Sequence, residues 1–123
     1  MTVRLAAAVA TSMMLIGAAG SAPGGDLEFF TGQALYAACS AKAGDADYAV
    51  RSTRCSAYVM GVSDAQQALQ GAGATQRVCL PASASAARMA DAVSRYLSDH
   101  AEKRPMAAQD LVIEALSAEY PCR

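Results

Sequence analysis

Hydrophobic side chains recur at steps of three and four residues between positions 52 and 69, and this spacing predicts an amphipathic α-helix. Ser52 or Thr53 can cap its start, because a hydroxyl oxygen there can accept from a free N–H of the first turn. The glycine-rich residues 71–75 should end it. Gly61, in the middle, either lets another backbone approach closely or is a tolerated small residue. The expected buried face consists of Cys55, Tyr58, Val59, Val62, Ala65 and Leu69.

Three more segments have the pattern of short helices, and no segment shows the alternation expected of β-strands. Residues 29–40 form the first helix, with Thr31 as its cap, and residues 41–53 form a polar loop with a Gly-Asp turn. Residues 86–100 and 106–120 form the last two, with Pro105 in the first turn of the fourth. The predicted fold class is all-α, a small bundle of about four helices in two antiparallel pairs. The expected core residues of these helices are Phe29, Phe30, Leu35, Tyr36, Cys39, Ala86, Met89, Val93, Tyr96, Leu97, Leu111, Val112, Ala115 and Leu116.

The start of the chain has the pattern of a secretory signal peptide. Arg4 precedes an apolar run from Leu5 to about Ala18, which is too short to span a bilayer comfortably, and small residues follow. We expect a cleaved signal peptide at residues 1–20, a flexible segment at 21–27 and a single domain at 28–123. An uncleaved anchor is the less favoured alternative. The exported domain is expected to have no stable membrane insertion.

All four cysteines, Cys39, Cys55, Cys79 and Cys122, lie in the expected mature part. An even number of cysteines in a short exported chain predicts disulfides. A zinc site would need a CxxC pair or clustered His and Cys, whereas every cysteine here stands alone, so no metal is expected. Three connectivities are possible. Antiparallel helix pairs favour Cys39–Cys55 and Cys79–Cys122, because each pair would then lie at the adjacent ends of two helices.

The formal net charge of the 123 residues is −1. This balance is too small to suggest nucleic acid or an anionic membrane as the partner.

The motifs, taken together, resemble those of the Rap1a/Tai family of immunity proteins. "FFTGQALYAAC" is similar to the family's first motif of an aromatic residue, Gly, Leu and Cys, and "RCSAYVMGVSDA" to its central motif. "VCLP", "AVSRYLSDH" and "PMAAQDLVIEALSAEYPC" resemble the remaining three, in order. Two positions depart from the usual pattern: Arg88 stands where Gln is usual, and Ala101 where Pro is usual.

The resemblance implies an exported, helical, disulfide-bonded periplasmic protein. It also implies a protein partner, a peptidoglycan amidase effector of a type VI secretion system, whose active site the immunity protein blocks. A homodimer is possible. The alternatives are a small periplasmic helical chaperone or stress protein, and an envelope structural protein without a toxin partner.

Catalysis and cofactors are not expected. His100 is the only imidazole, and it lies at a predicted helix C-terminus, where its cation suits the helix dipole. A general base would also need a nucleophile and an orienting partner, and the spacing supplies neither. Tyr58 and Asp64 belong to the family-like motif, where they could contact a partner. We instead expect a core tyrosine and a solvated or hydrogen-bonded carboxylate.

Partner binding is therefore expected on two exposed loops, residues 70–77 and 98–104, because loops held by a rigid scaffold often carry function. The alternative is that both are simple connectors. The candidate contact residues are Gln70, Thr75, Gln76, Arg77, Asp99, His100, Glu102 and Lys103.

Overall fold

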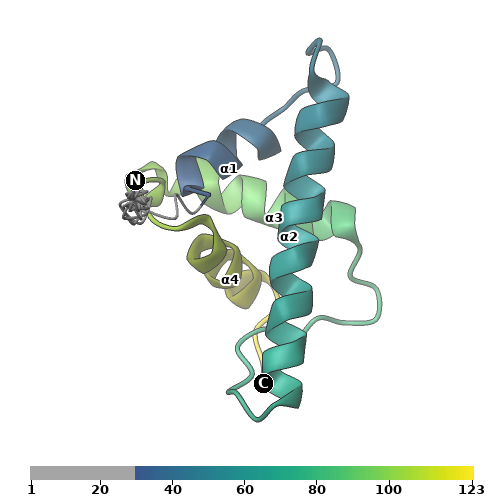
Figure 1. Ribbon diagram of the computed structural model, residues 1–123, viewed down its shortest axis with the longest axis vertical. Coiled ribbons are helices and arrows are strands. Elements are labelled where there is room, and N and C mark those ends of the chain that lie inside the picture. Colours follow the sequence, from purple (N-terminus) through teal and green to yellow (C-terminus); the bar gives the residue numbers. More distant parts are fainter. Residues whose placement is uncertain (1–29) are drawn as a thin grey trace, which may run out of the picture.

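The computed structural model describes residues 30–123. The predicted signal peptide, the segment 21–27 and Phe29 lie outside the described residues. The all-α fold class is confirmed: the described chain forms four α-helices and one short 3₁₀ helix (Figure 1). Their bounds are α1 Gly32–Cys39, α2 Tyr48–Gly71, α3 Ala86–Asp99, η1 Ala101–Lys103 and α4 Ala108–Glu119.

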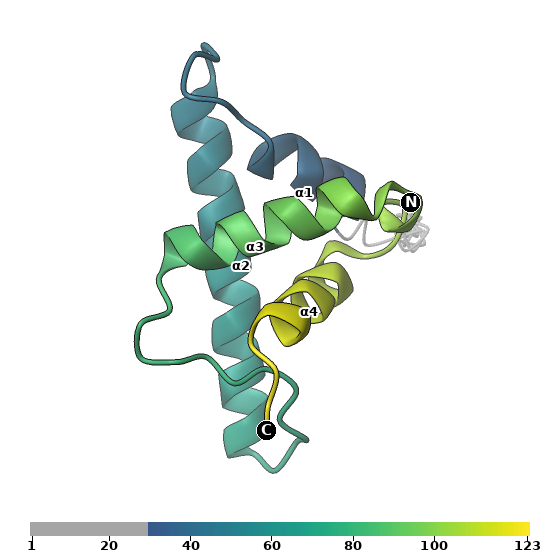
Figure 2. The same cartoon turned by 180° about the vertical axis from the view of Figure 1, so that it is seen from behind.

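The helices cross one another instead of lying parallel. α3 crosses α2 at a steep angle, and α1 also meets α2 steeply, so the first pair forms a corner in place of the expected antiparallel hairpin (Figure 2). α3 and α4 run in opposite directions and are joined through η1. The core lies where these helices meet, and its fully buried side chains are Leu35, Val59, Val93, Leu97, Leu111, Val112 and Leu116.

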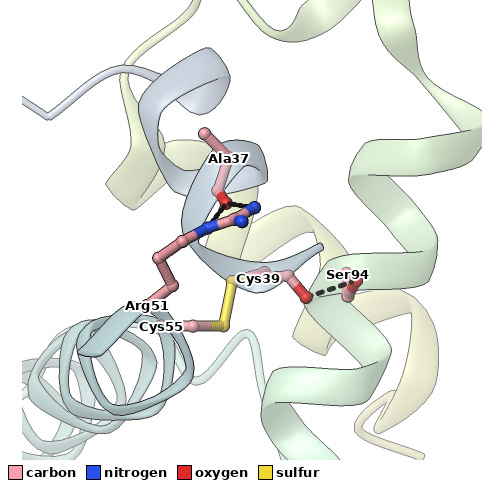
Figure 3. The surroundings of a disulfide bond; sticks show 5 residues. All are labelled: Ala37, Cys39, Arg51, Cys55 and Ser94. Atoms are coloured by element: carbon pink, nitrogen blue, oxygen red, sulfur yellow. Dashed lines mark hydrogen bonds between the residues drawn. A yellow bond between two sulfur atoms is a disulfide. The ribbon is translucent and has the colours of Figure 1, made fainter. Parts of the chain in front are cut away.

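Both predicted disulfides are confirmed, Cys39–Cys55 and Cys79–Cys122. The first joins the last residue of α1 to the third turn of α2 (Figure 3). Ser94 of α3 donates to the Cys39 carbonyl at 3.1 Å, so three helices are held at this point. The second disulfide holds the segment after α2 against the end of the chain, where the Cys79 N–H also donates to the Tyr120 carbonyl at 3.0 Å.

The start of α2 differs from the prediction. α2 begins at Tyr48, so the predicted loop at 41–53 was too long and the predicted caps, Ser52 and Thr53, were wrong. Arg51 explains the additional turn, because its guanidinium contacts the Asp45 carboxylate at 3.2 Å and donates to the Ala37 carbonyl of α1 at 2.8 Å. These polar contacts stabilise the first turns of α2. No buried apolar face marks these turns in the sequence, since Tyr48 and Val50 are exposed.

The end of α2 follows the glycine signal. Gly73 has a φ of 96°, the left-handed conformation that side chains rarely adopt. The Ala74 N–H donates to the Leu69 carbonyl at 2.9 Å, and the Gly73 N–H donates to the Gln70 carbonyl at 3.0 Å. These two bonds form a Schellman motif, which satisfies the last carbonyls of the helix and fixes where the chain turns.

α4 starts later than expected, and Pro105 lies in the turn before it, outside its first turn. The chain here pairs with the start of α1. The Gly32 N–H donates to the Met106 carbonyl at 2.8 Å, and the Ala108 N–H donates to the Phe30 carbonyl at 2.7 Å. The predicted cap of α1 is confirmed, since Thr31 Oγ1 accepts from the Ala34 N–H at 3.2 Å.

The close backbone approach occurs at Gly32, and Gly61 has no such neighbour. A Cβ on Gly32 would collide with the Leu111 side chain and lie 2.8 Å from the Arg104 carbonyl oxygen. A Cβ on Gly61 would meet nothing within 4 Å, so the hypothesis that Gly61 admits a neighbouring backbone of this chain was wrong. Gly61 is instead an exposed small residue on α2.

Candidate functional site

The second half of α2 and the loop that follows it form a long, largely exposed stretch of the described chain. We call residues 61–77 the α2 end. It extends beyond the other helices (Figure 1). Leu69 is 53% exposed, and Ala65 is also exposed, so their expected burial was wrong. The apolar spacing along α2 continues beyond the core, so Ala65 and Leu69 follow the pattern of buried positions although both face solvent.

The loop of the α2 end is held in place at both sides. Every residue from Ala72 to Arg77 is exposed. The Schellman motif fixes the loop where it leaves α2, and the Cys79–Cys122 disulfide fixes it two residues after Arg77. An exposed loop that is ordered before binding loses less conformational entropy on binding.

Two hollows flank the α2 end. The first, of about 190 Å³, lies between α2, the segment from Gln76 to Leu80, and α4. The second, of about 630 Å³, lies on the side of α2 that faces the start of α4. Val62, Gln66 and Ile113 line both hollows, so the hollows adjoin along these three residues.

The first hollow has an apolar floor and an amide rim, and no charged residue lines it. Its rim contains Gln66, Gln67, Gln70 and Gln76. Its floor contains Val62, Val78, Leu80, Ile113 and Leu116.

The second hollow is wider and more apolar. Tyr58, Gly61, Ala65 and Leu69 line it from α2, and Asp110 brings its single charge from α4. The absence of a side chain at Gly61 leaves this part of the wall open. The Tyr58 ring packs against the Phe30 ring with a centroid distance of 4.9 Å and an angle of 46° between the ring planes. Burial raises the pKa of the Tyr58 hydroxyl, and the nearby Asp110 carboxylate raises it further.

Of the candidate residues in the first predicted loop, Gln70 and Gln76 line the first hollow. Thr75 and Arg77 are exposed on the loop itself. Asp64 is exposed on α2, as expected for a solvated carboxylate. Sequence reasoning did not identify Gln66 and Gln67. The signal was present, because residues 66, 67 and 70 are glutamines at a spacing that places them together on a helix.

The second predicted loop lies elsewhere. Residues 98–104 are next to the start of α1, where the Gln33 N–H donates to the Arg104 carbonyl at 2.7 Å, far from the α2 end (Figure 2). Asp99 and Glu102 are exposed, whereas His100 packs edge-on against the Tyr96 ring at 4.2 Å. The structure therefore does not bring the two predicted loops together.

Lys103 in this second loop is engaged by its own chain. Its Nζ donates to Glu114 Oε2 at 2.7 Å and to the Tyr96 hydroxyl at 2.8 Å. The hydrogen bond to Glu114 raises the pKa of the Lys103 ammonium, and the same bond lowers the pKa of the Glu114 carboxyl. Burial and the hydrogen bond to Glu114 raise the pKa of Tyr96. This cluster ties η1 to α3 and α4, which is a structural role for Lys103.

Arg104 is held in the same way. Its Nε donates to the Leu97 carbonyl at 2.8 Å, and its guanidinium stacks on the Tyr36 ring at 3.6 Å. A stacked and hydrogen-bonded arginine of this kind stabilises the end of α3 against α1.

Within residues 30–123, no three His, Cys, Asp or Glu side chains gather in a way that could hold a metal ion. None of the helices in this described part combines the length and hydropathy needed to cross a membrane.

The model of the family "Rap1a immunity proteins" matches residues 31–122. The match spans every helix described above, and the chain therefore belongs to the Rap1a immunity protein family. Membership implies an immunity function against effectors of type VI secretion, exercised by binding a protein partner, and such proteins are in general not catalytic. Comparison with curated proteins and with solved structures gives no significant match.

Proposed function

We propose that this chain is a periplasmic immunity protein that binds a peptidoglycan amidase effector of a type VI secretion system and occludes its active site. Family membership supports the immunity role. The resemblance of the five motifs to members that neutralise amidases supports this effector class. The two disulfides support an oxidising compartment such as the periplasm.

The observation that carries the proposal is the form of the α2 end. It is a projecting helix terminus with a loop exposed from Ala72 to Arg77, anchored by the Cys79–Cys122 disulfide. A narrow and rigid projection of this kind suits insertion into an enzyme cleft, because little ordering is needed on binding.

The chemistry of the α2 end also predicts how the contact depends on salt. Between Gly61 and Arg77, only Asp64 and Arg77 carry charge, and the remaining surface is amide, apolar or small. Hydrogen bonds and apolar burial should therefore dominate binding. The affinity should change little with ionic strength, because few ion pairs are available to be screened.

The test uses the oxidised mature protein and the amidases encoded beside its gene. Equimolar protein should abolish hydrolysis of purified peptidoglycan by one of these amidases and should co-purify with it. Leu69→Glu, on the α2 end, should weaken inhibition. Val50→Glu is the matched control, because Val50 is 65% exposed on the first half of α2 and lies outside both hollows. Undiminished hydrolysis by every such amidase would rule the proposal out.

Compartment is tested separately by cell fractionation with thiol labelling. We expect the mature chain in the periplasmic fraction, with Cys39, Cys55, Cys79 and Cys122 protected from alkylation. A cytoplasmic chain with four reactive thiols would contradict the periplasmic assignment.

A further inference from the structure

The geometry points to a receiving site in the first hollow: it binds one uncharged apolar side chain on a loop of the partner protein, while the glutamines of its rim hydrogen-bond that loop's main chain. This inference rests on the proposed function for the identity of the partner. It adds a second contact in the opposite direction. The α2 end enters the partner's cleft, and a side chain of the partner enters the first hollow of this protein.

The size of the hollow selects the occupant. Its volume is about 190 Å³. Dedicated sites for drug-sized ligands and cofactors begin at about 300 Å³. An engineered apolar cavity of about 150 Å³ holds a benzene molecule. The first hollow therefore accommodates a single branched aliphatic or aromatic side chain.

The floor of the hollow is apolar and belongs to the core. Val78 is 8% exposed, Ile113 8% and Leu116 2%, and these three side chains come from the segment after α2 and from α4. An apolar side chain placed on them loses contact with water without leaving a polar group unpaired. A charged side chain would be desolvated with no opposite charge in the lining, which is costly.

The rim supplies both kinds of hydrogen-bonding group. Each glutamine amide carries two N–H donors and one carbonyl acceptor. Four such groups surround the opening: Gln66, Gln67 and Gln70 from α2, and Gln76 from the loop. A main-chain segment presents the same two functions, one N–H and one C=O per residue, so a neutral peptide matches this rim better than a phosphate or a carboxylate does.

The Gln76 side chain already makes one long hydrogen bond within its own chain. Gln76 Nε2 donates to the Val78 carbonyl at 3.4 Å, which leaves its carbonyl oxygen as the acceptor end. The Schellman turn at Gly73 brings the chain back so that Gln70 and Gln76 line one opening, and the Cys79–Cys122 disulfide fixes the far side. The hollow is thus a formed site between α2 and α4.

The first test needs no effector. The ¹⁵N-labelled, oxidised protein is titrated with N-acetyl-leucine methylamide and, in parallel, with N-acetyl-aspartate methylamide. The leucine probe should shift the side-chain amide signals of Gln70 and Gln76, and the aspartate probe should leave them in place. Equal shifts with both probes, or no shift at these glutamines with either, would overturn the inference.

The second test uses the effector and isosteric variants. Gln70→Glu and Gln76→Glu place a charge on the rim without changing its size, and each should weaken effector binding at least about tenfold. Gln33→Glu is the matched control, because Gln33 is an exposed glutamine on α1 that lines neither hollow. Circular dichroism checks that each variant folds.

The outcomes separate the two proposals. If the wild-type protein inhibits the effector and all three variants bind equally well, the receiving site is wrong and the immunity role stands. If no amidase is inhibited, the proposed function is wrong, and the titration with the leucine probe still decides whether the hollow binds a neutral apolar peptide group.

Discussion

Arg51 of α2 donates through Nε to the main-chain carbonyl of Ala37, in the last turn of α1, at 2.8 Å (Figure 3). The same guanidinium contacts the Asp45 carboxylate at 3.2 Å. A cation at the C-terminal end of a helix interacts favourably with the helix dipole and satisfies a free carbonyl. Together with the Cys39–Cys55 disulfide one turn further along α2, this contact sets the angle at which α1 meets α2.

Replacement of Arg51 should therefore destabilise the corner between α1 and α2. We expect Arg51→Met to lower the free energy of unfolding by about 1–2 kcal/mol, because the charge-assisted hydrogen bond from the partly buried guanidinium to the Ala37 carbonyl is lost. Arg54→Met is the control, since Arg54 is exposed on the same helix and should change stability by less than about 0.5 kcal/mol. Urea unfolding of both variants with intact disulfides measures the difference. Equal midpoints would contradict this role of Arg51.

Gly32 and Gly61 form a matched pair for a second prediction. Gly32→Ala should destabilise the protein by about 1–3 kcal/mol, because the new methyl group clashes with both the Leu111 side chain and the Arg104 backbone. Gly61→Ala should stabilise it by up to about 1 kcal/mol, because alanine is the better helix residue and nothing obstructs its Cβ. Thermal unfolding reports both effects. The same sign for the two variants would contradict the packing described here.

The two disulfides should differ in their resistance to reduction. Cys55 is 4% exposed and belongs to the core, whereas Cys122 is exposed near the end of the chain. Mild reductant should therefore open Cys79–Cys122 first, and mass mapping of alkylated peptides should follow the order. Prior opening of Cys39–Cys55 would contradict the prediction.

Loss of either disulfide should also reduce stability. Closing loops of 16 and 43 residues contributes about 3 and about 4 kcal/mol in the chain-entropy model. The paired variants Cys39→Ala/Cys55→Ala and Cys79→Ala/Cys122→Ala test this by urea unfolding. The first pair should lose more than its 3 kcal/mol, because it also leaves a cavity in the core. If the Cys39→Ala/Cys55→Ala variant unfolds at the same urea concentration as the wild type, the place of this disulfide in the core is contradicted.

The Lys103–Glu114 pair should make stability depend on pH. The folded protein lowers the pKa of the Glu114 carboxyl below its ordinary value of 4.5, chiefly through the hydrogen bond from Lys103. The ionised carboxylate is therefore favoured in the folded state, and this contribution is present above pH 4.5 and is lost as the pH falls through the folded pKa. The raised pKa of Lys103 keeps its ammonium charged well into the alkaline range.

Glu114→Gln should accordingly reduce the melting temperature at pH 7, and the gap to the wild type should narrow on acidification below pH 4.5. Glu119→Gln serves as the control, because the Glu119 side chain is 45% exposed and its ion pair with Arg95 is at the surface. Melting curves from pH 7 to pH 2 measure both. A gap for Glu114→Gln that stays constant over this range would contradict the proposed linkage.

Local signals in the sequence predicted much of the fold. The helical periodicity indicated four helices, and the Thr31 cap and the glycine-rich end of α2 were predicted correctly. The favoured cysteine pairing was also correct, although α1 and α2 meet at a corner and not as the antiparallel hairpin on which the Cys39–Cys55 pair was argued. The start of α2 was missed because Arg51 stabilises it through contacts with α1 and the preceding loop. The start of α4 was missed because residues 104–108 pair with the start of α1, a partner distant in sequence.

The candidate site was less predictable than the fold. Periodicity predicts which face of α2 is apolar, but it does not predict where the core ends along the helix, so Leu69 was assigned to the core although it is 53% exposed. Lys103 resembled a surface charge until the structure placed Tyr96 and Glu114 within hydrogen-bonding distance. The first hollow depends on α2, α4 and a disulfide meeting in space, and local patterns contain no such information.

We propose that the α2 end is the surface that faces the effector. Hydrogen–deuterium exchange of the oxidised protein, measured alone and with the proposed amidase effector, distinguishes this surface from residues 98–104. Residues 61–80 should exchange more slowly on binding, and exchange of residues 98–104 should stay unchanged. Protection confined to residues 98–104, with the α2 end exchanging as in the free protein, would contradict it.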